Sequence, residues 1–509
     1  MEVSHKNDVL PSLAIDELGQ FVRRRRQQWE TEGFVSDLEG FERDLHERVM
    51  ALERALIAEE LARYDVDVEE IEVEGTTYRQ ALASTETYMS AAGPVTVERH
   101  LYRPAGRSTK SICPLELRAG IVRGLFTPRA ARQGTFVMAH LTPREAAALF
   151  AELGGMTPSR STLDRLPKEL SCRWEEQREV WEEALRAAEV VPGEAAVLAV
   201  SLDGVMVPMK DAGRAEKRSQ PDKQASGPAG FREVGCGTVV LYDADGERLS
   251  TTRYGRMPEY KKATLCRQLE AECQSISALR PDLKVVKLAD GAEENWRFLD
   301  KLDLGLPSHL LAEVEEISIV DFCHAAEHLK KACDAIWNDN NIKSKAEFER
   351  FRTLLKEEDN GVEIVIRSIK YHFSRARGRR REQIGEQLTY FRNQRHRMQY
   401  ARYLREGLPI ASGVIEAACK TLATQRMKQS GMSWGQVGGQ AILTLRSLIQ
   451  SNRWERAWAL LHADFCKSVN VVKPKHASSQ SQCQDTPVPI LIRNDVINVT
   501  HYASLPLVA

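Results

Sequence analysis

The chain has 509 residues, a length that predicts about three structural units rather than one core. Hydrophobic residues make up 42% of it and charged residues 28%, as in an ordinary globular protein, and no apolar run is long enough to span a bilayer. Positive and negative side chains nearly cancel, with a formal net charge of −1, so only their local distribution can indicate a nucleic-acid partner. Residues 1–10 lack the apolar stretch of a secretory signal, which predicts a cytoplasmic protein.

Two segments of the N-terminal part have a clear period. Between residues 37 and 64, apolar side chains recur in steps of three and four, which predicts an amphipathic helix. The stripe consists of Leu38, Phe41, Leu45, Val49, Leu52 and Leu56. It can pack against the rest of this region, the commoner outcome, or form the seam of a homodimer. Residues 93–102 alternate between apolar and polar side chains and predict a short β element.

A helix-turn-helix outline follows. Thr142 can cap a first helix that has Pro143 at its first position, Gly154 and Gly155 can form a turn, and a second helix opens near Ser159 or two residues later. In a DNA-binding helix-turn-helix the second helix lies in the major groove. The side chains that would then contact DNA are Arg160, Ser161, Thr162 and Arg165. Two short helices joined by glycines also occur in other helical domains, so that alternative stays open.

The central part carries acidic residues at the ends of expected strands. Residues 195–209, AAVLAVSLDGVMVPM, form an apolar run broken by Asp203, which predicts a buried central strand. Two more strands flank the turn at residues 243–246, whose Asp-Gly sequence indicates a hairpin. After a helix, LKVVKLADG predicts a fourth strand ending at Asp290, and ISIV predicts a fifth ending at Asp321.

This order of elements is that of an RNase H-like fold. Three antiparallel strands come first, and helices then alternate with parallel strands. In such a fold the acid of the first strand approaches the acid that follows the fourth, which here are Asp203 and Asp290. We therefore expect a multidomain α+β protein whose RNase H-like core has a mixed five-stranded sheet. Paired carboxylates are the hard oxygen ligands that Mg²⁺ prefers.

A third acid would have to come from a later helix, and residues 409–426 supply Glu416. Ser412 is expected to be the N-cap of this helix. Glu416 can also be a surface residue that pairs with Lys420, four positions further on. The residues alone leave both alternatives open.

A basic segment lies between residues 363 and 428. It includes Arg377, Arg379 and Arg380 and has Tyr and Phe side chains interleaved, a composition that can neutralise DNA phosphates. A solvated helical face, balanced by acidic helices elsewhere, would have the same composition. Its position inside a catalytic domain favours DNA binding.

Five motifs between residues 90 and 460 resemble the ISKra group of bacterial insertion-sequence transposases, within the DDE superfamily. They are SLDGVMV around Asp203, FREVGCGTV after it, LADGAEENW around Asp290, DFCHAAEHL from Asp321, and SGVIEAACKTLATQRMKQSGMSW around Glu416. In that group three acids coordinate the catalytic metals, so the resemblance assigns this role to Asp203, Asp290 and Glu416. It also implies an accessory role for Asp321 with His324, and a helical insertion that contains the basic segment.

The resemblance implies DNA cleavage followed by strand transfer, with two Mg²⁺ or Mn²⁺ ions per active site. We expect Asp203 to bridge the ions and Asp290 and Glu416 to hold one each, while Arg426 and Lys428 bind the DNA backbone. The expected partners are double-stranded DNA, namely the terminal inverted repeats of the element and the target, and further copies of the chain in a homodimer or larger assembly. The expected location is the nucleoid in bacterial cytoplasm. Two alternatives are an RNase H-like nuclease or resolvase with the same acids, and a non-catalytic DNA-binding regulator.

These expectations divide the chain into consecutive units. They are an N-terminal helical region that can serve dimerisation (1–90), a DNA-binding region with the helix-turn-helix (91–190), the first part of the catalytic core (191–337), a basic helical insertion (338–406), the second part of the core with the Glu416 helix (407–465), and a tail expected to be disordered (466–509).

Overall fold

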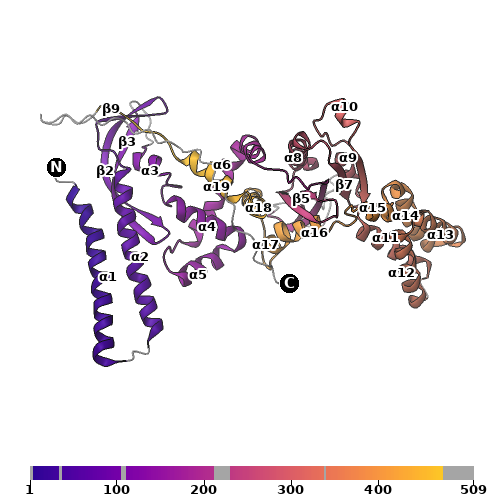
Figure 1. The fold of residues 1–509 in the computed structure, drawn as a ribbon, viewed down its shortest axis with the longest axis horizontal. Coiled ribbons are helices and arrows are strands. Elements are labelled where there is room, and N and C mark those ends of the chain that lie inside the picture. Colours follow the sequence, from indigo (N-terminus) through magenta and orange to yellow (C-terminus); the bar gives the residue numbers. More distant parts are fainter. Residues whose placement is uncertain (1–3, 34–36, 105–110, 211–229, 338–339, 474–509) are drawn as a thin grey trace.

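The computed structural model describes residues 4–33, 37–104, 111–210, 230–337 and 340–473. It is a mixed α+β structure, as expected, with one five-stranded mixed sheet and one four-stranded antiparallel sheet. In Figure 1 its parts follow one another along the long axis, from a helical hairpin at the N-terminal end to a group of helices within residues 341–405. Within the described ranges, no helix combines the length and the apolar character needed to cross a membrane.

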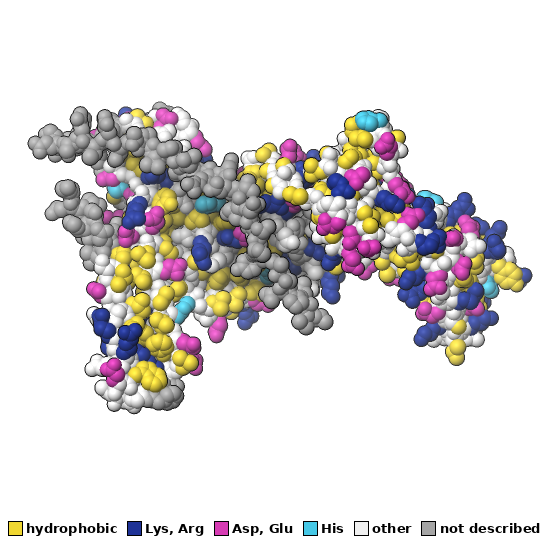
Figure 2. Space-filling model, in the orientation of Figure 1, with side chains coloured by type: hydrophobic (Ala, Val, Ile, Leu, Met, Phe, Trp, Pro, Cys, Tyr) yellow, Lys and Arg dark blue, Asp and Glu magenta, His cyan; other side chains and the backbone are white. Residues whose placement is uncertain are grey.

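Helices α1 (Ser4–Glu32) and α2 (Leu38–Arg63) form the hairpin. Helix α2 confirms the helix predicted at residues 37–64, and Asp37 caps its N-terminus. Part of the apolar stripe packs inside the hairpin, where Phe41 stacks on Phe21 with ring centroids 5.5 Å apart. The rest stays exposed, and Figure 2 shows hydrophobic side chains along this hairpin. The exposed members of the stripe are Leu38, Val49 and Leu56.

The four-stranded sheet has the order β3-β2-β1-β9. Its strands are β1 (Glu70–Val73), β2 (Thr76–Ser90), β3 (Gly93–Pro104) and β9 (Asn470–Lys473). Two expected boundaries need correction. Strands β2 and β3 form one hairpin, so a boundary at residue 90 would cut a hydrogen-bonded pair of strands. Strand β9 pairs with β1, so residues 470–473 belong to this sheet and not to a disordered tail. The rest of the expected tail, 474–509, lies outside the described residues.

The expected pair of helices around Gly154 is present as α5 and α6. The helices of this region are α3 (Pro114–Ala119), α4 (Pro128–His140), α5 (Pro143–Leu153) and α6 (Arg160–Ala187). Thr142 caps α5 in a capping box with Glu145, and Ser159 caps α6, as the sequence predicts. One buried cluster joins α4, α5 and α6 to α18 (Gln436–Gln450) and α19 (Trp454–Phe465). The expected units 91–190 and 407–465 therefore share a hydrophobic core.

The five-stranded sheet has the order β6-β5-β4-β7-β8, with β4 in the centre. Its strands are β4 (Val197–Pro208), β5 (Phe231–Tyr242), β6 (Arg248–Arg256), β7 (Lys284–Ala289) and β8 (Glu316–Val320). Strands β4, β5 and β6 pair antiparallel, whereas β7 and β8 add in parallel on the other side of β4. The five predicted strands are therefore confirmed. Asp203 lies on β4, Asp290 directly follows β7, and Asp321 directly follows β8.

Helices cover both faces of this sheet. Helix α8 (Ala263–Leu279) packs closely on one face, because a Cβ at Gly237 of β5 would lie 2.8 Å from Leu269 Cδ1. Cys236 faces the other way and packs among residues of α16 (Gly413–Ala418), the π-helical turn η3 (Cys419–Thr424) and α18. The helix expected to carry Glu416 thus lies against the face of β4 and β5 that α8 leaves open.

Residues 341–405 form the expected helical insertion between α11 (Phe322–Ile336) and α16. It consists of α12 (Asn341–Glu357), α13 (Gly361–Arg375), α14 (Gly378–Gln394), η2 (Arg395–Arg397) and α15 (Tyr400–Arg405). Its buried side chains belong to the same cluster as those of the sheet. Figure 2 shows many Lys and Arg side chains on this end of the molecule. The short helices elsewhere in the core are η1 (Tyr260–Lys262), α9 (Glu293–Leu299), α10 (Ser308–Leu311) and α17 (Gln425–Met427).

Candidate functional site

Asp203 and Asp290 lie side by side at one end of the five-stranded sheet. Ser201 of β4 pairs with Leu288 of β7 in parallel register, so the next residues on the same face of each strand are Asp203 and Asp290. Neighbouring strands lie about 4.8 Å apart, which brings the two carboxylates within reach of each other. Burial raises the pKa of Asp203, and repulsion from Asp290 raises it further. The proximity predicted from the sequence is confirmed.

The chain holds Asp203 at both oxygens. Oδ1 accepts the backbone N–H of Gly204 at 2.7 Å, and Oδ2 accepts the thiol of Cys419 at 3.6 Å. A thiol is a weak donor, so this second contact marks proximity more than strength. It shows that the helix carrying Glu416 reaches β4 one turn after Glu416.

Asp290 is held from one side only. Its Oδ1 accepts the N–H of Ala292 at 3.1 Å and the side-chain amide of Asn295 at 3.0 Å. Its backbone carbonyl accepts the indole N–H of Trp296 at 2.6 Å. No hydrogen bond from a described residue reaches Oδ2, which leaves that oxygen available to a ligand.

Glu416 lies with Asp321, which follows β8 at the same end of the sheet. Its side chain is exposed, and its Oε1 is 2.7 Å from the hydroxyl of Ser412. The same hydroxyl is 2.5 Å from Asp321 Oδ2. Glu416 and Lys420 are both described and form no ion pair within 4.0 Å, so the alternative that Glu416 pairs with Lys420 finds no support.

We call Asp203, Asp290, Asp321 and Glu416 the acid cluster. Within the described ranges, none of the four forms an ion pair within 4.0 Å with a Lys or Arg. Nor do any three His, Cys, Asp or Glu side chains there converge closely enough to hold a metal ion. The structure thus brings Asp203 to Asp290 and Asp321 to Glu416. The four carboxylates do not converge on a common point.

The insertion adds a tyrosine that the sequence did not single out. Tyr390 of α14 approaches the acid cluster so closely that a Cβ at Gly291 would lie 2.5 Å from its ring. Burial raises the pKa of Tyr390, and Asp290 and Asp321 raise it further. Its hydroxyl is buried and has no hydrogen-bond partner among the described residues. No local pattern marks Tyr390, because only the fold brings α14 to the end of β7.

His324 lies near this tyrosine. Its ring centroid is 6.2 Å from that of Tyr390 and 5.0 Å from that of His328, which itself stacks on Tyr390 at 3.6 Å. The nearest carboxylate partner of its Nδ1 is Glu327, at 4.0 Å. His324 therefore belongs to an aromatic group beside Asp321, and no hydrogen bond joins the two described side chains of the expected accessory pair.

The residues expected to contact DNA on the second helix of the helix-turn-helix outline lie at the start of α6. Three of them are exposed, namely Arg160, Ser161 and Arg165. Thr162 is half-buried, and its hydroxyl lies 2.8 Å from that of Ser159. This end of α6 can be reached by a partner, while further along the helix one face packs in the core.

In the basic insertion the three arginines differ. Arg377 and Arg379 are exposed and make no ion pair with a described carboxylate. Arg380 instead donates to the carbonyl oxygens of Ala335, at 2.9 Å, and Ile336. These carbonyls end α11 and have no partner within that helix, so Arg380 caps α11.

Arg426 does not lie where the sequence suggested. It was expected to bind the DNA backbone, but it is 2% exposed and donates to the carbonyl of Leu141 at 2.9 Å, just after α4. Burial lowers its pKa to about 10. The physical reason is that the α4 end offers unpaired carbonyls that attract a buried cation. Lys428, two residues further on, is exposed and remains available to a phosphate.

Comparison of the sequence with protein-family profiles and with curated proteins gave no match.

Proposed function

We propose that this chain is a DNA transposase of a bacterial insertion sequence, which cleaves element ends and joins them to target DNA at the acid cluster. The observation that carries the proposal is that four carboxylates gather at one sheet end without a described Lys or Arg within 4.0 Å. Carboxylates placed in this way repel one another unless a cation neutralises them. The motif resemblance around Asp203, Asp290 and Glu416 points to the same function.

The strand order supports an RNase H-like identity for the core. In β6-β5-β4-β7-β8, the first three strands in the chain are antiparallel and the last two are parallel to the first. Asp203 on the central strand and Asp290 after its parallel neighbour occupy the positions that this fold gives to paired acids. The insertion between α11 and α16 explains why Glu416 comes late in the chain.

The donor set fits Mg²⁺ or Mn²⁺, because carboxylate oxygens are hard ligands and Asp203 lies beside Asp290 in the register of the two parallel strands. Asp203, Asp290 and Glu416 are the residues that would hold the ions. Ions bound there would activate the attacking water or 3′-hydroxyl and stabilise the leaving oxygen. Glu416 is exposed and held by Ser412, and Cys419 one turn later contacts Asp203, so the helix brings the Glu416 carboxylate to the same sheet end as the paired aspartates.

DNA contacts follow from the exposed cations. The start of α6, with Arg160 and Arg165, would read element ends in the major groove. Arg377, Arg379 and Lys428 would neutralise phosphates without reading bases. A second copy of the chain would bring the other element end, and the exposed stripe on α2 is the surface that we assign to it.

Strand cleavage tests the proposal directly. Purified protein is incubated with its own genomic flanks in Mg²⁺ or Mn²⁺, and cut and joined strands are mapped. We expect Asp203→Asn, Asp290→Asn and Glu416→Gln each to lose cleavage by orders of magnitude while keeping binding to element ends. Glu183→Gln, at an exposed acid on α6, is the matched control and should cleave normally.

Other outcomes separate the alternatives. Cleavage that depends on the three acids but never joins ends would indicate a nuclease or resolvase. Selective binding without any cleavage would indicate a regulator. If the three acid variants cut DNA as well as the wild type does, the acid cluster is not the active site.

A further inference from the structure

Asp321 has no role in the proposed chemistry. It is a buried carboxylate, 4% exposed, at the end of β8. Its Oδ1 accepts the backbone N–H of Cys323 at 2.8 Å and that of Ser412 at 3.3 Å. Its Oδ2 accepts the hydroxyl of Ser412 at 2.5 Å. Both oxygens are engaged within the chain, so Asp321 is better placed to hold other residues than to hold an ion from solution.

Ser412 departs from the usual behaviour of a residue at its position. It is the N-cap of α16, but its hydroxyl makes no hydrogen bond to the N–H groups of that helix. The hydroxyl lies between two carboxylates instead, 2.5 Å from Asp321 Oδ2 and 2.7 Å from Glu416 Oε1. A serine hydroxyl has one hydrogen, so at any moment it donates to one of the two carboxylates, and it links the acids because it can turn to either of them.

Two hydrogen bonds keep Ser412 beside Asp321. The N–H of Phe322 donates to the carbonyl of Ile410 at 2.9 Å, and the hydroxyl of Tyr400 donates to the carbonyl of Val320 at 2.9 Å. These two bonds attach the segment that returns from the insertion to the junction of β8 and α11. The end of β8 therefore fixes where α16 begins.

We propose that Asp321 is a positioning residue that sets the carboxylate of Glu416 through Ser412. This inference rests on the proposed function, in which Glu416 is a metal ligand. The Ser412 hydroxyl makes the one hydrogen bond that reaches the Glu416 side chain from the described residues. An exposed glutamate otherwise samples many rotamers, and the link to a buried, fully engaged aspartate restricts them.

The first arm of the test needs no metal. Ser412→Ala, Glu416→Ala and the double variant are unfolded with urea in EDTA, and the shifts of the midpoint are compared. If the two side chains interact, the shift of the double variant differs from the sum of the single shifts. The control pairs Ser344→Ala with Glu416→Ala. Ser344 of α12 is 1% exposed and donates to Asp334 of α11 at 2.6 Å, so its shift should simply add to that of Glu416→Ala.

The second arm measures Mn²⁺ binding from the rise in unfolding temperature with Mn²⁺ concentration. We expect Ser412→Ala to need roughly tenfold more Mn²⁺ than the wild type for the same rise, as for other residues that orient a metal ligand. Asp321→Ser, which retains a residue able to cap α11, should behave like Ser412→Ala. Ser412→Thr keeps the hydroxyl and should restore the wild-type response, and Ser344→Ala should not change it.

The outcomes are distinct. Additive shifts in EDTA, or an unchanged Mn²⁺ response in Ser412→Ala, overturn the positioning role and leave the proposed function standing. If the wild type shows no rise with Mn²⁺ while the EDTA shifts are still non-additive, the proposed function fails and the positioning role fails with it. Non-additive shifts together with a weakened Mn²⁺ response support both.

Discussion

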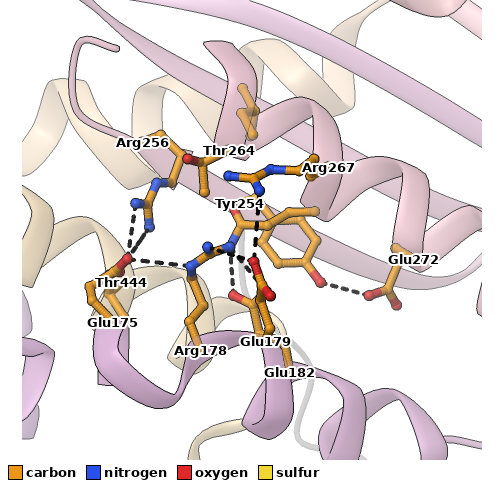
Figure 3. A network of polar contacts seen from close by, with 12 residues as sticks. Glu175, Arg178, Glu179, Glu182, Tyr254, Arg256, Thr264, Arg267, Glu272 and Thr444 are labelled. Carbon is orange, nitrogen blue, oxygen red and sulfur yellow. Dashed lines mark hydrogen bonds and ion pairs between the residues drawn. The ribbon is translucent and has the colours of Figure 1, made fainter. Parts of the chain in front are cut away.

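Two groups of acidic side chains in this protein differ in what neutralises them. The acid cluster at the end of β4 and β7 has no described Lys or Arg within 4.0 Å. The second group, which we call the buried charge network, lies where α6, β6, α8 and the start of α19 meet, and Figure 3 shows most of its members. It comprises Glu175, Arg178, Glu182, Glu189, Tyr254, Arg256, Glu272 and Arg453.

Within the network the chain supplies its own counter-charges. The side chains of Arg453 and Glu272 are 2% and 1% exposed, and their charged atoms are 2.5 Å apart. Tyr254 donates to the other oxygen of Glu272 at 2.6 Å, and Arg256 pairs with Glu175 at 2.8 Å. The partners come from different elements, so the network attaches the long helix α6 to the sheet.

The difference separates a structural role from a functional one. Where the fold supplies both charges of a buried pair, the loss of one partner destabilises the fold, because the other charge is then left buried without compensation. Charges that the chain gathers without neutralising them oppose folding, and for such a group we propose that a cation from solution compensates. The acid cluster is of the second kind.

Breaking the buried charge network should have the largest effect on stability. Arg453→Leu leaves Glu272 buried without a cation, which we expect to cost about 3–5 kcal/mol of the free energy of unfolding. Urea unfolding in EDTA measures it. Arg297→Ala, in an exposed pair with Glu293, is the matched control and should have a far smaller effect. A loss in Arg453→Leu no larger than in the control would mean that the network does not stabilise the fold.

A substitution in the acid cluster should change the stability of the fold in the opposite direction and by a smaller amount. The pKa of Asp203 is raised in the folded state by burial and then by Asp290, so its ionised form destabilises the fold above that pKa. In EDTA at neutral pH, Asp203→Asn should therefore unfold at a slightly higher temperature than the wild type. The gain should shrink as pH falls through the folded pKa toward the ordinary range of Asp.

An aspartate with its own cation provides the contrast. The pKa of Asp282 is lowered by its hydrogen bond with Arg280, so its ionised form stabilises the fold, and this contribution is lost as pH falls through the lowered pKa. Asp282→Asn should thus give no gain at neutral pH. If Asp282→Asn raised the unfolding temperature as much as Asp203→Asn, the account would be contradicted. It holds that the surroundings of Asp203 disfavour its ionised form and that Arg280 favours the ionised form of Asp282.

Sequence patterns predicted the parts of the fold that local rules govern. The apolar run around Asp203 specified a central strand, and the positions of Thr142 and Ser159 specified two helix starts, because strand burial and capping depend on neighbours in the chain. The proximity of Asp203 to Asp290 also followed, since a parallel pair of strands fixes it.

Contacts between distant segments could not be predicted in this way. The pairing of β9 with β1 depends on strand edges far apart in the chain, and no pattern in residues 470–473 names that partner. Arg426 looked like a phosphate ligand because its type suits one, but the carbonyls after α4 bind it. Ser412 was expected to cap a helix. Its hydroxyl contacts Asp321 and Glu416 instead, because the chain returns to the end of β8 after the insertion.

Direct Mn²⁺ binding tests the central claim, that the acid cluster needs a cation from solution. Isothermal titration calorimetry with Mn²⁺ is performed on the wild type, on the double variant Asp203→Asn/Asp290→Asn, and on Glu183→Gln as the control acid. We predict that the wild type and the control bind Mn²⁺ alike, and that the double variant folds but does not bind. Equal binding by the double variant would contradict the account, because the paired aspartates would then not be where the cation is held.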